Sequence, residues 1–130
     1  MIRPLVTHTG IEEFIPVSTL ETLIYENGDI GKNITYLKVD IEGFEFSSFE
    51  NWFKTDIFKN VDQFGMEVHI HPIFYKNVNA QKWFAKLHKH ILKLSEYDLN
   101  LVETEPNLCI GKSVDFMNIY YPFNDLLFVK

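Results

Sequence analysis

Residues 35–45 read Thr-Tyr-Leu-Lys-Val-Asp-Ile-Glu-Gly-Phe-Glu and contain the change from a strand to a helix. Residues 35–41 are rich in β-branched and aromatic side chains, and Gly43 follows them. A short run of this kind that ends near a glycine predicts a buried strand. From Phe44 to about Lys54 the apolar residues recur at helical spacing, which predicts a helix directly after the strand.

Helices and strands are expected to alternate along the rest of the chain. Ser18 and Glu21 have the spacing of a capping box, which predicts a helix that begins at Ser18 and ends near Asn27. Alternating apolar residues predict a second strand at 62–70. A long helix is expected at 79–97, and further strands at 99–103, 116–120 and 126–129. This order predicts one α/β domain over residues 1–130, with helices packed on a largely parallel sheet and an antiparallel edge at the C-terminus.

Composition and charge exclude several classes of protein. The net charge of -6 argues against a nucleic-acid binder, which needs a basic face. The single cysteine, Cys109, excludes an intramolecular disulfide and a zinc site with several thiolates. No apolar run reaches the roughly 18 residues of a membrane span, so none is expected. The compartment stays open, and the glycosylation sequon at Asn33 matters only in the secretory pathway.

Two polar clusters are expected at the carboxyl ends of the parallel strands, where ligands bind in open α/β sheets. The first is Asp40, Glu42 and Glu45. An acidic side chain in the first turn of a helix is stabilised by the helix dipole. This structural role explains Glu45 well and Glu42 in part. Asp40 lies inside an apolar run, and an unpaired buried charge costs several kcal/mol, so we expect it to have a partner or a ligand.

The second cluster is Glu67, His69 and His71, which alternate along the second strand and so share one face. Two histidines and a carboxylate are a feasible set of metal ligands, and a polar strand end is the alternative. A metal-dependent hydrolase that uses these three residues and Asp40 is therefore one hypothesis.

A row of lysines lies on the long helix opposite its apolar face, at Lys82, Lys86, Lys89 and Lys93. It is either a solvated face or the contact for a phosphate-bearing partner. The glycines form neither G-x-G nor G-x-x-x-x-G-K-S/T, so the chain lacks a recognisable phosphate or nucleoside cradle.

Three segments carry a resemblance to a known family. They read Ser-Thr-Leu-Glu-Thr-Leu at 18–23, Tyr-Leu-Lys-Val-Asp-Ile-Glu-Gly-Phe-Glu at 36–45 and Met-Glu-Val-His at 66–69. Together they resemble the C-terminal half of the FkbM-type methyltransferases and are similar to related methyltransferase-like proteins of animals, whose pattern is T-L-D, K-x-D-x-E-G-x-E and E-x-H. The sequence departs from that pattern at Glu21 and Phe44. Residues 125–129 also suit the family's last strand.

The resemblance implies a Rossmann-like fold and methyl transfer from S-adenosylmethionine, often to oxygen. It places Asp40, Glu42 and Gly43 at the cofactor, and Asp40, Glu67 and His69 at the reacting groups, with Glu67 or His69 taking a proton from a small-molecule or glycan-like acceptor. The family's first strands and glycine-rich loop have no counterpart here. We therefore expect the C-terminal portion of such a domain, with weak cofactor binding by itself, and a non-catalytic interaction domain as the alternative.

Overall fold

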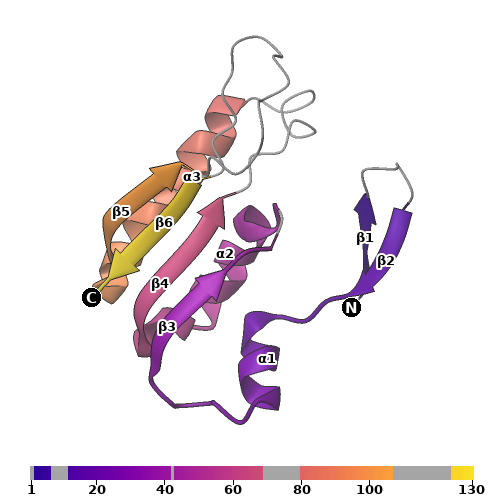
Figure 1. The fold of residues 1–130 in the computed structure, drawn as a ribbon, viewed down its shortest axis with the longest axis horizontal. Coiled ribbons are helices and arrows are strands. Elements are labelled where there is room, and N and C mark those ends of the chain that lie inside the picture. Colours follow the sequence, from indigo (N-terminus) through magenta and orange to yellow (C-terminus); the bar gives the residue numbers. More distant parts are fainter. Residues whose placement is uncertain (1, 7–11, 42, 69–79, 107–123) are drawn as a thin grey trace. The chain divides into compact units, whose positions relative to one another are not determined.

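The computed structural model describes residues 2–6, 12–41, 43–68, 80–106 and 124–130. The chain forms two compact units, Met1–Lys32 and Asn33–Lys130, and Figure 1 shows their elements. None of the helices in the described part of the chain is both long and apolar enough to cross a membrane.

The first unit contains a strand pair and a short helix. Strands β1 (Ile2–Val6) and β2 (Glu12–Pro16) pair antiparallel, and α1 (Leu20–Glu26) follows. The cap of α1 is Thr19, whose hydroxyl accepts a hydrogen bond from the backbone N–H of Thr22 at 3.2 Å. The prediction of Ser18 as the cap is therefore wrong by one residue. Serine and threonine hydroxyls can both accept this hydrogen bond, and here Thr19 does so.

The second unit is built on a four-stranded sheet with the order β3-β4-β6-β5. Its strands are β3 (Ile34–Val39), β4 (Val61–Val68), β6 (Asn124–Val129) and β5 (Asn100–Pro106). Strands β3 and β4 pair parallel, whereas β6 pairs antiparallel with both β4 and β5. Three strands therefore run in the same direction, and β6 runs against them.

The sheet corrects two expectations about strand arrangement. The largely parallel sheet is not confirmed, because among the strands that the structure describes only the β3–β4 pair is parallel. The C-terminal strand does pair antiparallel, but β6 lies inside the sheet and β5 is the edge strand. Burial explains this position, since Leu126 and Phe128 are both buried and an interior strand has neighbours on two sides. The strand expected at 116–120 lies outside the described residues.

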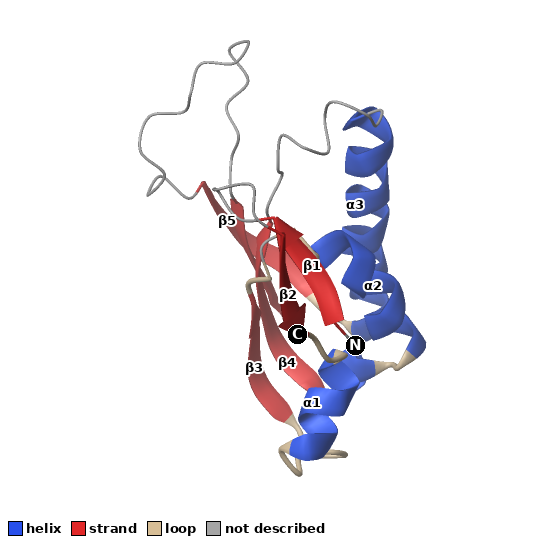
Figure 2. Ribbon diagram, turned by 90° about the vertical axis from the view of Figure 1, so that its right-hand side faces the viewer, coloured by secondary structure: helices blue, strands red, loops and turns tan. Residues whose placement is uncertain are grey.

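Helices α2 (Glu45–Lys54) and α3 (Ala80–Leu94) lie on the same side of this sheet, as Figure 2 shows. Aromatic side chains fill the space between the two layers. The Trp52 ring of α2 lies 6.0 Å from the Phe64 ring of β4, which in turn lies 5.8 Å from Phe128 of β6. Phe49, Phe58, Phe64 and Phe128 have no exposed surface. The core between the sheet and the two helices is thus largely aromatic.

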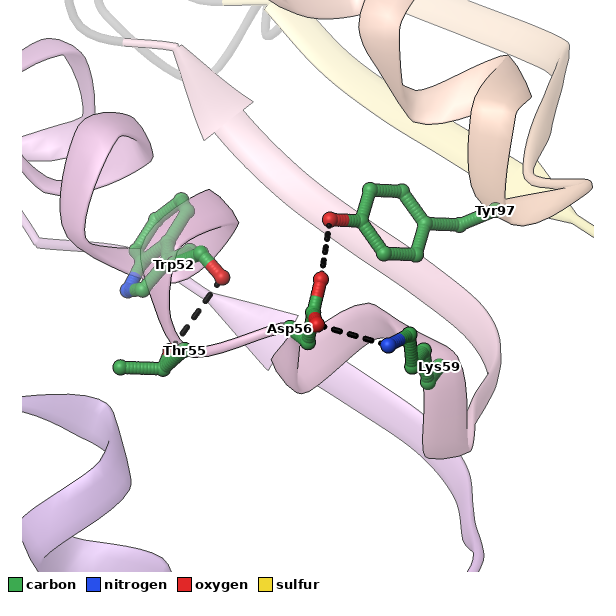
Figure 3. A network of polar contacts seen from close by, with 5 residues as sticks. All are labelled: Trp52, Thr55, Asp56, Lys59 and Tyr97. Atoms are coloured by element: carbon green, nitrogen blue, oxygen red, sulfur yellow. Dashed lines mark hydrogen bonds and ion pairs between the residues drawn. The ribbon is translucent and has the colours of Figure 1, made fainter.

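A polar network closes the end of this core where α2 meets the short helix η1 (Ile57–Asn60), as Figure 3 shows. The Asp56 carboxylate accepts a hydrogen bond from the Tyr97 hydroxyl at 2.9 Å and pairs with the Lys59 ammonium at 2.7 Å. Lys59 and then Tyr97 lower the pKa of Asp56. Tyr97 belongs to η3 (Ser95–Tyr97), so the network joins two turns that are distant in sequence.

Candidate functional site

The carboxyl ends of β3 and β4 lie side by side because the two strands are parallel. Val39 lies opposite Met66 in the register. One residue further along each strand, Asp40 and Glu67 follow, so the sheet brings two predicted site residues to the same level. Asp40 is exposed and Glu67 is half-buried. Adjacent carboxylates of this kind can attract a cation, and one of them can accept a proton.

The reason given for choosing Asp40 from the sequence is wrong, although its position agrees with the prediction. Its side chain is exposed, whereas the expectation was a carboxylate inside a buried run. Strand β3 ends at the buried Val39, and Tyr36 and Lys38, four and two residues before Asp40, are also exposed. Because side chains alternate between the faces of a strand, Asp40 continues this polar series. Exposure, and not burial in an apolar run, is therefore the setting of the Asp40 carboxylate.

The buried carboxylate of the first cluster is that of Glu45, which has no exposed surface. One of its oxygens, Oε1, accepts a hydrogen bond from the backbone N–H of Ile41 at 3.2 Å. The backbone N–H of Phe44 also donates to the Ile41 carbonyl at 3.1 Å, and Gly43 has a φ of 97° that a residue with a side chain rarely adopts. Glu45 and Gly43 therefore shape the turn that follows Asp40. Glu42 lies outside the described residues.

An ion pair crosses the sheet close to these carboxylates, on the face that carries Glu67 and Gly65. The Lys38 ammonium of β3 lies 2.6 Å from an Asp125 carboxylate oxygen of β6, and β4 lies between the two strands. Burial lowers the pKa of Lys38, but the hydrogen bond and charge of Asp125 outweigh it, with help from Tyr36 and Glu67, so that the pKa lies above its usual value of 10.5. Asp125 is also the register partner of Glu67.

The glycine beneath this ion pair has a steric reason to be there. Gly65 of β4 lies opposite Lys38, and a Cβ atom at this glycine would overlap the Tyr36 hydroxyl group. The Tyr36 ring therefore extends over β4 at a place where only a glycine leaves room for it. Sequence reasoning missed the roles of Tyr36, Gly65 and Asp125, because pairing across strands is not visible in a local pattern.

Only two of the four residues in the metal hypothesis, Asp40 and Glu67, are described by the structure. His69 and His71 lie outside the described residues, so their contribution stays a prediction. Among the residues that the structure does describe, no group of three His, Cys, Asp or Glu side chains could hold a metal ion. The described site is thus a pair of strand-end carboxylates beside a lysine–aspartate ion pair.

Comparison with known proteins agrees with the motif pattern. The family model described as the methyltransferase FkbM domain matches residues 4–100. The matched region includes the strand-end residues Asp40 and Glu67. It also includes Glu45 and Lys38. No curated protein and no solved structure matches the chain.

Proposed function

Because the chain belongs to the FkbM methyltransferase domain family, we propose that it contributes to methyl transfer from S-adenosylmethionine to a hydroxyl group. The observation that supports this proposal is the position of Asp40 and Glu67 at neighbouring carboxyl ends of β3 and β4. In an open α/β sheet this edge is where ligands bind.

The side chains at this edge suit such a cofactor in charge. S-adenosylmethionine supplies an electrophilic methyl group on a positively charged sulfonium. The exposed carboxylate of Asp40 would favour that positive charge, and the turn at Gly43, with its φ of 97°, would leave the adjacent backbone open to the cofactor. Glu42 completes the proposed cofactor set by its position in the sequence.

Removal of the acceptor's proton is the second task of the site. A hydroxyl is a weak nucleophile, and a base within hydrogen-bond reach helps it to react. Glu67 is half-buried and lies at the level of Asp40, which suits it for this role. His69 is the alternative base, two residues further along the chain. We propose a small-molecule or glycan-like acceptor and no nucleic acid, in keeping with the net charge of -6.

The chain is expected to bind the cofactor weakly, because it contains no G-x-G segment to hold a nucleoside. A method that detects weak binding at single residues is therefore needed. We propose to titrate the ¹⁵N-labelled chain separately with S-adenosylmethionine and with S-adenosylhomocysteine, which lacks the sulfonium charge. Shifts should gather at the ends of β3 and β4.

The two ligands separate an electrostatic role of Asp40 from a structural one. The Asp40→Asn variant should lose affinity for S-adenosylmethionine and keep its affinity for S-adenosylhomocysteine. The matched control is Asp98→Asn, an exposed residue with a φ of 63° that asparagine tolerates. Equal losses for both ligands, or shifts located away from these strand ends, would contradict the proposal and favour a non-catalytic interaction domain.

A further inference from the structure

Helix α3 carries a cationic face that the proposed methyl transfer does not use. Its 15 residues contain four lysines and no acidic residue. The lysines are spaced by four, three and four positions, so they form a single row along the helix, about 16 Å long. All four are exposed, and we call this surface the lysine face: Lys82, Lys86, Lys89 and Lys93.

The packing of α3 holds this face outward. Leu87, His90 and Leu94 are buried on the other side of the helix, and the His90 ring stacks on Phe49 of α2 with 4.9 Å between the centroids. The helix therefore cannot rotate to hide the lysines without unpacking its core side. The lysine face is a fixed feature of the helical layer, which lies on one side of the sheet (Figure 2).

Two of the four lysines have partners in the described part of the chain. Lys86 pairs with Glu50 of α2 at 3.0 Å, and the Lys93 ammonium lies 4.7 Å from the centre of the Phe53 ring. Within the part of the chain that the structure describes, neither Lys82 nor Lys89 forms an ion pair. These two positive charges are thus available to an external anion.

An exposed apolar side chain accompanies the charges. Leu92 keeps 58% of its surface exposed and follows Lys89 by three positions, which places it beside the lysine row on the same side of the helix. An exposed leucine side chain contributes no hydrophobic free energy. Burial beneath lipid headgroups would remove its apolar surface from water, which is favourable. A basic helix surface with an exposed leucine beside it can bind anionic headgroups through its lysines and insert the leucine among them.

We propose that the lysine face of α3 docks the protein on an anionic phospholipid membrane surface. The face has lysines but no arginine, and arginine is the residue favoured for paired contacts with nucleic-acid phosphates. The rest of the chain carries the net negative charge, so an approach through α3 is electrostatically favourable compared with the average of the other surfaces. The attraction comes from surface lysines, and it should therefore weaken as salt screens them.

Sedimentation with phospholipid vesicles tests the proposal. The chain should bind vesicles that contain about one-third phosphatidylserine at low salt and should not bind pure phosphatidylcholine vesicles. The Lys82→Gln/Lys89→Gln variant should bind roughly 25-fold more weakly, which is about fivefold for each lysine. The Leu92→Ser variant should bind more weakly but keep the salt dependence.

A matched variant separates the face from overall charge. Lys32→Gln/Lys130→Gln removes the same charge from two exposed lysines outside α3 and should bind as the unchanged protein does. Circular dichroism checks that every variant is folded. The proposal is overturned if the chain does not bind the anionic vesicles, if both double variants lose affinity equally, or if a single-stranded oligonucleotide binds more tightly than the vesicles.

Discussion

The Lys38 ammonium and the Asp125 carboxylate are 2.6 Å apart and connect β3 to β6 across the intervening strand β4. About 40% of each side chain is exposed, at 42% and 40%. Water and salt therefore screen the attraction, and its contribution to stability is small. Its position matters more, because it spans the strand end that carries Glu67.

The ion pair should show a small, salt-dependent coupling between its two side chains. In a double-mutant cycle of Lys38→Met and Asp125→Asn, we expect a coupling free energy of about 0.2–1 kcal/mol at low salt. Urea unfolding of the four proteins gives this value, and repeating it at about 1 M salt should reduce it. A coupling that stays unchanged at high salt would mean that packing, and not charge, joins the two residues.

Gly65 should couple to the exposed Tyr36 side chain. An alanine at Gly65 places its Cβ atom against the tyrosine hydroxyl, so the ring must swing away from β4. Because the obstructing atom is the end of a half-exposed side chain, we expect Gly65→Ala to cost no more than about 1 kcal/mol. The Tyr36 ring resonances should shift in proton NMR spectra.

The same glycine substitution should lose its cost once the ring is gone. In the Tyr36→Ala background, Gly65→Ala should be neutral or stabilising, because the Cβ atom then meets no tyrosine and alanine restricts the unfolded chain. Comparing urea midpoints in the two backgrounds checks this. The same cost in both would show that the backbone of β4, and not Tyr36, requires glycine.

His90 should make the stability of the protein depend on pH. Its ring is 8% exposed and stacks on Phe49. Burial, and then the charges of Lys86 and other α3 lysines, lower the pKa of His90 below its usual 6.5, although Glu50 opposes them. As the pH falls through 6.5, the unfolded chain takes up the proton more readily, so the free energy of unfolding should decrease until the pH passes the folded pKa.

A phenylalanine at this position should remove that loss. His90→Phe keeps an aromatic ring but cannot take up a proton, so its free energy of unfolding should fall less between about pH 7.5 and pH 5.5 than that of the unchanged protein. The exposed His88 provides the control, because His88→Phe should keep the original pH dependence. Equal pH dependence in the unchanged protein and His90→Phe would rule out His90 as its source.

Regular elements with a strong apolar period were predictable from the sequence. The strand at 35–41 and the helix after it correspond to β3 and α2, and the strand at 62–70 corresponds to β4. Helix α2 and strand β4 have buried apolar residues at the period of their own structure. The expectation that the first strand is buried is wrong, because β3 lies at an end of the described strand order and buries only Val39. The insertion of β6 between β4 and β5 was not predictable, because strand order depends on contacts between distant segments.

The site was predictable only as a set of positions. Asp40 was found because charged residues are unusual near the end of an apolar strand. Its exposure was missed, because the sequence does not show which face of the sheet a side chain at the strand end lies on. Lys38 looked like an ordinary polar strand residue, and its partner Asp125 is 87 positions away in the chain. Such a pair becomes visible only when the sheet register is known.

The position of β6 has a consequence for the newly made protein. This strand comes after β5 in the chain but lies between β5 and β4. While the ribosome has released only the segments up to β5, two strands have unpaired backbone edges that face the missing one. Open edges of this kind invite pairing with other chains. Protection of these two edges during translation therefore depends on β6, which emerges after both of its neighbours.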